Sequence, residues 1–108
     1  MDMFKMFGKM KDMQKKVDEI KKHISTLQAT GESGGGLVKV IINGKKKILS
    51  LDIDNTLLKE NEKTILEDLI VAATNIATKN IEIKIKDTIQ NNYKDMLGNL
   101  PIDLENLF

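Results

Sequence analysis

The sequence predicts an α+β fold in which a long helix, a small antiparallel sheet and a second long helix follow one another. Three observations predict this order. Apolar residues recur at heptad spacing in residues 1–28, a glycine run and alternating apolar residues follow in residues 29–53, and an apolar pattern almost free of helix breakers fills residues 54–97. Residues 98–108 form a tail. We expect all 108 residues to form one domain, because domains of about 150 residues are usual.

The first helix is expected from about Asp2 to Gln28, because its apolar residues are three and four positions apart in turn. This spacing is an a/d seam held for nearly four heptads. Methionine packs adaptably, so the methionine-rich first half is expected to be the looser end. The seam contains Met3, Met6, Met10, Met13, Val17, Ile20, Ile24 and Leu27, of which we assign Val17, Ile20 and Ile24 to the core or a dimer interface.

The central segment predicts a hairpin with a possible third strand. Gly34–Gly36 supply the backbone freedom for a tight reversal. Residues 37–42 alternate as a strand with one apolar face, formed by Val38, Val40 and Ile42, and we assign Val38 and Val40 to the core or dimer interface.

A return strand is expected over residues 47–53, because Asn43-Gly44 is a strong hairpin signal. Simple alternation places Ile48 with Ser50 on one face of this strand and Leu49, Leu51 and Ile53 on the other. Residues 29–33 add a third strand if they pair.

The second helix is expected to begin at Asn61 as its N-cap. Two neighbouring apolar stripes give it a broad buried face, and we assign Leu69 and Ile76 to the core or dimer interface. Residues 81–86 alternate like a strand. We interpret them as helix because Ile85, Ile89 and Tyr93 continue at helical spacing without a breaker, up to Gly98.

The composition offers little for catalysis. The chain has no cysteine and one histidine, His23, which is expected on a solvated helix surface. Asp52 and Asp54 suit turn chemistry better than a metal or acid–base site. The glycine run leads into a strand and lacks the lysine of a phosphate loop. We therefore expect no enzyme, no metal or other cofactor and no small-molecule substrate. No apolar run reaches the length of a membrane span, so we expect no membrane partner.

Charge is distributed unevenly along the chain. Residues 1–50 hold 11 lysines and 5 acids, a net charge of +6, whereas residues 51–108 hold 6 lysines and 11 acids, a net charge of −5. Such asymmetry favours a polyanionic partner for the first half, although a highly charged protein also divides unevenly by chance. All 17 basic residues are lysine. Because arginine dominates base reading in the major groove, any DNA binding is expected to show weak sequence preference.

The lysines of the first helix fall into two stripes. Lys11, Lys15 and Lys22 lie opposite the apolar seam. Lys5, Lys9 and Lys16 form the second stripe, and Lys45–Lys47 form another basic cluster beside the hairpin turn. These lysines are candidates for contacts with DNA phosphates. The alternative is a solvated coiled-coil surface, supported by the i,i+4 pairs Asp12–Lys16 and Asp18–Lys22.

The segment Thr30-Gly31-Glu32-Ser33-Gly34-Gly35-Gly36-Leu37-Val38-Lys39-Val40, followed by Asn43-Gly44, Ile53-Asp54, Leu57-Leu58 and Leu66–Asn75, resembles the YbaB/EbfC family of bacterial nucleoid-associated proteins. The methionine- and lysine-rich residues 10–16 are also similar to that family's first helix. The resemblance implies a tweezer-like homodimer with projecting helical arms. It further implies a cytoplasmic, nucleoid-located protein that binds duplex DNA and influences nucleoid organisation and gene expression.

Two other functions compete with this interpretation. A protein-interaction scaffold would use the methionine-rich seam and would bind with little dependence on salt. A membrane-surface protein would use Phe4 and Phe7 beside the lysines, as in an interfacial helix.

Overall fold

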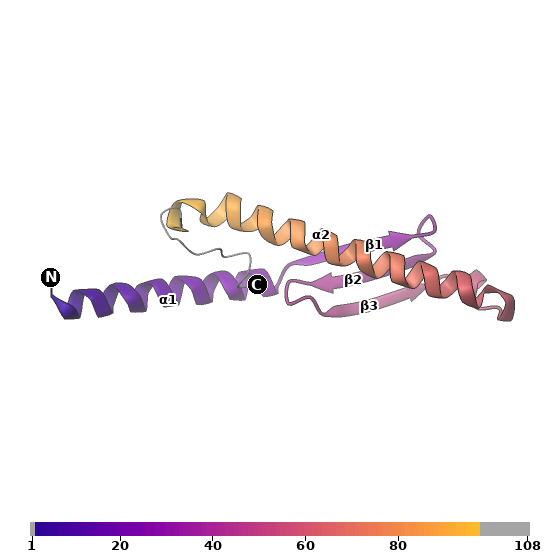
Figure 1. Ribbon diagram of the computed structural model, residues 1–108, viewed down its shortest axis with the longest axis horizontal. Coiled ribbons are helices and arrows are strands. Elements are labelled where there is room, and N and C mark those ends of the chain that lie inside the picture. Colours follow the sequence, from indigo (N-terminus) through magenta and orange to yellow (C-terminus); the bar gives the residue numbers. More distant parts are fainter. Residues whose placement is uncertain (1, 98–108) are drawn as a thin grey trace.

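The computed structural model describes residues 2–97 and confirms the predicted order of elements (Figure 1). The molecule is a rod with extents of 72 × 18 × 17 Å. A three-stranded antiparallel sheet of order β1-β2-β3 stands between the two helices in the chain. The elements are α1 (Met3–Ser25), β1 (Gln28–Ser33), β2 (Val38–Asn43), β3 (Ile48–Ile53), the 3-10 turns η1 (Asn55–Leu57) and η2 (Glu60–Glu62), and α2 (Lys63–Leu97).

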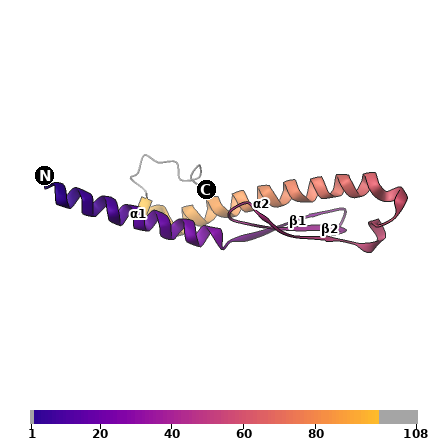
Figure 2. The same cartoon turned by 90° about the horizontal axis from the view of Figure 1, so that it is seen from below.

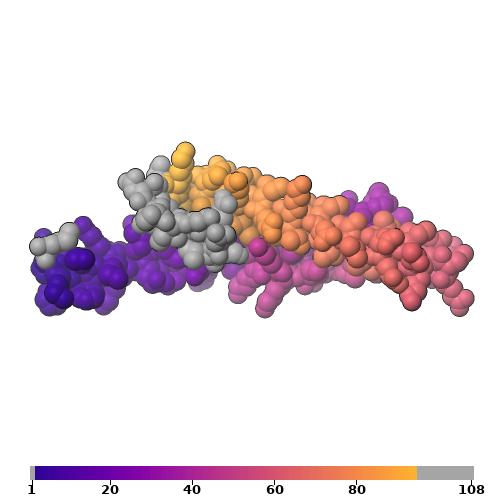
Figure 3. All heavy atoms as spheres, viewed as in Figure 1, coloured from indigo at the N-terminus to yellow at the C-terminus, as the bar shows by residue number. Residues whose placement is uncertain are grey.

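Helix α1 is shorter than predicted, because Gln28 begins β1 instead of ending the helix. The Asp2 carboxylate caps its start by accepting a hydrogen bond of 3.0 Å from the Phe4 amide. Every residue from Asp2 to Asp12 is exposed, and only Ile20 and Ile24 are fully buried. The N-terminal half of α1 therefore projects as an arm beyond the rest of the molecule (Figure 3).

The possible third strand is real, since β1 pairs with β2 along its whole length. The predicted apolar face of β2 is also real: Val38, Val40 and Ile42 are all buried. The reversal between β1 and β2 depends on glycine, because Gly34, Gly35 and Gly36 have φ angles of 63°, 69° and 94°. Side-chain-bearing residues rarely adopt this left-handed region.

The hairpin after β2 forms, but Asn43-Gly44 is not its centre. The positive φ of 64° belongs to Lys46, whose amide donates a hydrogen bond to the Asn43 carbonyl, and Lys45–Lys47 lie in the turn itself. The Asn43 carboxamide oxygen accepts hydrogen bonds from the Lys45 and Lys47 amides. Glycine is needed at position 44 for space, because a Cβ there would collide with the Ile24 carbonyl of α1.

Strand β3 departs from simple alternation. A bulge pairs Ile42 with Ile48 while Ile41 pairs with Ser50, so Leu49 is the extra residue. Directly paired residues share a face of the sheet. Ile48 therefore lies on the face of Leu51 and Ile53, not with Ser50 as predicted.

Helix α2 covers one face of the sheet and then runs back beside α1 (Figures 1 and 2). Ala73, Ala77 and Ile81 are fully buried, and Ile85 and Ile89 continue the buried stripe, so residues 81–86 are helical as interpreted. The predicted N-cap was wrong, because Asn61 lies inside η2.

Two residues of α2 assigned to the core or dimer interface have different surroundings. Leu69 is partly buried and packs against the core, whereas Ile76 is 42% exposed. Ile65, eleven residues before Ile76 and on the same side of α2, is 50% exposed, so the single chain leaves this part of the helix surface partly uncovered.

His23 is not the solvated histidine that the sequence predicted. It is partly buried, and its Nδ1 lies 2.7 Å from the Tyr93 hydroxyl of α2. The two rings meet edge to face, with centroids 5.9 Å apart. This contact joins the C-terminal half of α1 to the end of α2.

Replacing Tyr93 with phenylalanine is expected to lower the free energy of unfolding by about 1 kcal/mol, because it removes the hydroxyl but keeps the ring. Urea denaturation checks the value. The variants Tyr93→Phe and His23→Phe and their combination form a double-mutant cycle with a coupling of similar size. Fully additive single effects would show that the two side chains do not interact.

Candidate nucleic-acid interface

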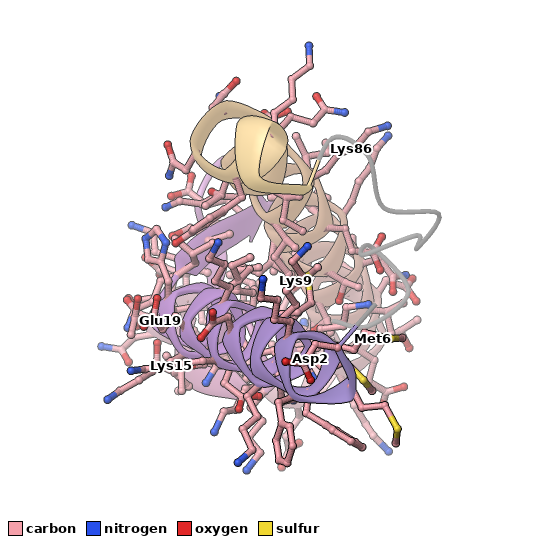
Figure 4. All side chains as sticks on the ribbon, turned by 90° about the vertical axis from the view of Figure 1, so that its left-hand side faces the viewer. Asp2, Met6, Lys9, Lys15, Glu19 and Lys86 are labelled. Atoms are coloured by element: carbon pink, nitrogen blue, oxygen red, sulfur yellow. The ribbon has the colours of Figure 1, made fainter. Side chains whose placement is uncertain are left out.

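All six candidate lysines of α1 are exposed, and none forms an ion pair within the part of the chain that the structure describes. Lys9, Lys16 and His23 follow at steps of seven residues. Because His23 contacts Tyr93, the stripe of Lys5, Lys9 and Lys16 lies on the side of α1 nearer α2, and Figure 4 shows Lys9 pointing toward that helix. Lys15 points to the outside, so the stripe of Lys11, Lys15 and Lys22 faces away from the protomer.

Acidic side chains separate the two stripes. Asp12 and Glu19 lie between them at helical spacing, and Figure 4 places Glu19 on the same side of α1 as Lys15. Asp18 adjoins the outward stripe and accepts a 3.0 Å hydrogen bond from the Gln14 side chain. Residues 2–25 still hold seven lysines against four acids, a net charge of +3. Helix α1 as a whole is therefore basic without being uniformly so.

The fold places the three turn lysines, Lys45–Lys47, at the base of the arm. The Gly44 amide donates a 2.9 Å hydrogen bond to the Leu27 carbonyl just after α1. All three lysines are exposed, and Lys46 forms an ion pair of 3.4 Å with Glu82. Two basic clusters separated by more than 20 residues in sequence therefore meet at one end of the sheet.

Sequence reasoning missed the lysines of the C-terminal half of α2. Residues 77–94 hold four lysines and two acids, and α2 brings them back beside α1. Lys84 donates a 2.8 Å hydrogen bond to the Gln28 carbonyl, while Lys79, Lys86 and Lys94 are exposed. The long uninterrupted helix was the available signal, but a one-dimensional pattern does not show where the helix returns.

The opposite end of the rod is acidic. Residues 48–76 hold two lysines and six acids, a net charge of −4. The pKa of Asp54 is lowered by hydrogen bonds from the Thr56 amide and hydroxyl, so this carboxylate keeps its charge to a lower pH than an unbonded one. Positive charge is thus concentrated at the end of the rod that holds α1, and negative charge at the opposite end.

Other kinds of site find little support in residues 2–97. An open groove of about 590 Å³ between β1 and α2 is lined mostly by amide and hydroxyl side chains, with Lys84 and Asp87 as its charged groups. No group of three or more histidine or acidic side chains in the described residues suits a metal ion. None of the described helices is both long and apolar enough to cross a bilayer.

Comparison with known proteins agrees with this geometry. Residues 1–96 match the model of the YbaB/EbfC DNA-binding family. The chain is 43% identical over 101 residues to the nucleoid-associated protein mlr5504 of Mesorhizobium japonicum and equally to nucleoid-associated protein Atu0095 of Agrobacterium fabrum, covering 94% of this chain and 91% of each relative. An uncharacterized Helicobacter pylori protein, HP0035, has a similar structure, with a TM-score of 0.68 and 28% identity over 91% of this chain and 99% of its own.

These matches confirm the prediction that the chain belongs to a non-catalytic, DNA-binding family. A basic, exposed arm on a non-catalytic scaffold is what binding to a polyanion requires. The chain belongs to the YbaB/EbfC DNA-binding family.

Proposed function

We propose that this chain is a nucleoid-associated protein that binds duplex DNA as a homodimer, through contacts between lysines and phosphates. Its relatives are named as nucleoid-associated proteins, which supports a location on the nucleoid within the cytoplasm and a role in nucleoid organisation and gene expression.

The separation of charge along the rod carries the proposal. The arm of α1, the turn lysines 45–47 and the C-terminal half of α2 gather at one end, and the acids of residues 48–76 gather at the other. DNA attracts the basic end and repels the acidic end, so the field orients the protein before contact. Exposed ammonium groups then replace counterions along the phosphates.

The chemistry of these side chains supports weak sequence preference. Lysine presents a compact charge on a flexible stem and lacks the planar fork with which arginine reads guanine. The basic residues of this chain are all lysine, and the arm lysines have no fixed partner in the described residues. Phosphate contacts of this kind position a protein without reading bases.

A homodimer would double the number of arms. Each chain offers one basic arm, and apolar residues of β3 and α2 remain half exposed in the single chain. Two copies that bury such surface would hold two arms on one assembly, and linked contacts raise the effective affinity for a long ligand such as DNA.

A salt series of DNA binding tests the proposal. If the homodimer makes about six phosphate contacts, the logarithm of the binding constant is expected to fall with the logarithm of salt concentration with a slope of about −5. Fluorescence anisotropy with labelled duplexes of unrelated sequence gives the slope and the sequence preference together. A lack of duplex binding at low salt with tens of micromolar protein would overturn the proposal.

The interaction scaffold remains the second candidate, and one observation favours it. Met3, Met6 and Met10 are 67%, 49% and 64% exposed, so the methionine-rich seam of the arm is uncovered in the single chain. Methionine surfaces adapt to varied apolar partners. The salt series separates the two functions, because apolar docking on this seam would depend little on salt.

A further inference from the structure

The arm of α1 carries two aromatic side chains that contacts with DNA phosphates leave without a role. Phe4 is 85% exposed and Phe7 is 55% exposed, and beside them are the exposed methionines Met3, Met6 and Met10. All residues from 2 to 12 are exposed, so nothing in the described part of the chain covers these side chains. Several large apolar side chains exposed side by side mark a surface that meets another molecule.

The apolar side chains of the arm form one broad face. At about 3.6 residues per turn, Met3, Met6 and Met10 fall close to one line along the helix. Phe7 lies beside this line, and Phe4 lies beyond Phe7 in the same direction around the helix. Together these side chains cover roughly half of the helix circumference, which is wider than the narrow a/d seam of a coiled coil.

Lysines border this apolar face on both sides. Lys9 lies at one margin of the face, and Lys11 and Lys15 lie at the other. The opposite side of the helix holds acidic groups, since Figure 4 shows Glu19 across α1 from Met6. Lysines at the margins of an apolar face lay their stems along it and keep their ammonium groups at a polar boundary. The arm therefore has an apolar centre, cationic margins and a back that faces water.

This arrangement fits the surface of a bilayer that contains anionic lipid better than it fits the other partners. The phosphate backbone of DNA attracts the lysines but offers the rings no apolar surroundings. A coiled-coil partner covers only a narrow seam and would leave Phe4 in water. At a bilayer surface, the boundary between headgroups and acyl chains takes the apolar side chains, and the lipid phosphates take the ammonium groups. Charge and apolar surface are thus complementary to lipid together.

We propose that residues 3–15 of α1 lie on the surface of an anionic membrane as an interfacial helix, with the aromatic and methionine side chains inserted and Lys9, Lys11 and Lys15 at the lipid phosphates. Such a helix lies in the plane of the membrane surface, so it needs no apolar run long enough to span a bilayer. The proposal departs from the expectation of no membrane partner, which rested on the length of a span. It adds a second anionic partner to the proposed function.

Co-sedimentation with vesicles at physiological salt tests the partner. The natural chain is expected to bind vesicles of mixed phosphatidylcholine and phosphatidylglycerol at least about tenfold more tightly than vesicles of phosphatidylcholine alone, because each lysine near an anionic surface raises the affinity several-fold. Binding to neither kind of vesicle at millimolar lipid would overturn the proposal. Equal binding to both kinds would remove the lysines from the contact and would overturn it as well.

Two matched double variants test the insertion of the rings. Phe4→Ser with Phe7→Ser is expected to weaken binding to the anionic vesicles by at least about tenfold, because two rings no longer leave water. Its affinity for duplex DNA is expected to change by less than about threefold, because no charge is altered. The control, Leu58→Ser with Val71→Ser, removes side chains 61% and 59% exposed away from the arm and is expected to keep vesicle binding. Circular dichroism checks that both variants are folded. A phenylalanine variant that binds the vesicles like the natural chain would overturn the insertion.

Fluorescence reports the position of the arm directly, since the natural chain has no tryptophan. The emission of Phe4→Trp is expected to shift to shorter wavelength on anionic vesicles, as the ring leaves water, whereas that of Leu58→Trp stays unchanged. An unshifted Phe4→Trp would overturn the proposal. Sedimentation equilibrium without lipid tests the competing occupant: loss of self-association in the phenylalanine double variant would assign the face to a second copy and overturn the proposal too. A chain that binds vesicles but not DNA would overturn the proposed function alone.

Discussion

Replacing Lys11, Lys15 and Lys22 together with glutamine is expected to lower the affinity for duplex DNA by on the order of a hundredfold near 0.1 M salt. Each phosphate contact contributes roughly a factor of ten at this salt through counterion release, and two or more of these lysines per arm are within reach of one duplex. Glutamine keeps the helix propensity of lysine, so α1 itself is expected to persist. Fluorescence anisotropy measures the affinity, and the salt slope should become less steep by about 0.9 for each phosphate that no longer meets a lysine.

A control triple variant makes the same change, three lysines to glutamine, at the other end of the rod. Lys39, Lys59 and Lys63 are exposed in the sheet and at the start of α2, and Lys39 and Lys63 form only surface ion pairs. Their replacement by glutamine changes the net charge equally and is expected to alter affinity by less than about threefold, because salt screens charges that lie far from the arm along a rod 72 Å long.

A third variant distinguishes the two faces of the arm. Replacing Lys5, Lys9 and Lys16 with glutamine is expected to have a smaller effect than the outward triple, because this stripe lies toward α2. Equal reductions in affinity for the outward triple and the control triple would show that affinity follows net charge alone. That result would remove the arm from the binding site.

Gly31→Ala is expected to lower the free energy of unfolding by about 3 kcal/mol, because the added methyl group meets backbone atoms of α2. A Cβ at position 31 would collide with the Ala73 carbonyl and the Ala77 amide and would lie 2.8 Å from the Ala77 Cα. These are backbone atoms of α2, which cannot rotate away as a side chain does. The helix would have to lift from β1 and loosen the buried contacts of Ala73 and Ala77, and overpacking of this kind typically costs about 1–3 kcal/mol or more.

Gly8→Ala provides the matched control. A Cβ at Gly8 meets nothing within 4 Å, and the residue lies within α1. Alanine favours helix over glycine by about 1 kcal/mol, so this variant is expected to be as stable as the natural chain or slightly more stable. Urea denaturation followed by circular dichroism, at several protein concentrations, compares the two. Equal stability of Gly31→Ala and the natural chain would mean that α2 does not press on β1 as described.

Much of the fold could be predicted because its signals are local. The alternation of Val38, Val40 and Ile42 requires only that a strand has two faces, and the structure buries all three. The glycine run at 34–36 predicts a reversal because few other residues accept a positive φ, and all three have one. The helical interpretation of residues 81–86 rested on periodicity across neighbouring turns, which the strand-like alternation did not outweigh.

Two of the errors share a physical cause, since each depended on a contact between segments far apart in sequence. His23 is expected to be solvated when α1 is considered alone, but it meets Tyr93 after α2 has crossed the sheet and returned. Gly44 is a turn signal in the sequence, yet the residue is small because the Ile24 carbonyl lies against it. The bulge at Leu49 shifted the faces of β3 by one residue, and nothing in the local pattern marks it.

By itself, the sequence determined the kinds of secondary-structure elements and their order, because short periodicities need no knowledge of packing. Composition alone determined the chemistry of the charged surface: every basic residue is lysine, and the lysines are in excess in the first half of the chain. Only the tertiary structure decided that the C-terminal half of α2 returns beside α1 and that the turn lysines stand at the base of the arm. Those outcomes depend on the direction in which a 35-residue helix crosses a three-stranded sheet. That direction is set by the close approach of Gly31 to Ala73 and Ala77, residues more than 40 positions apart.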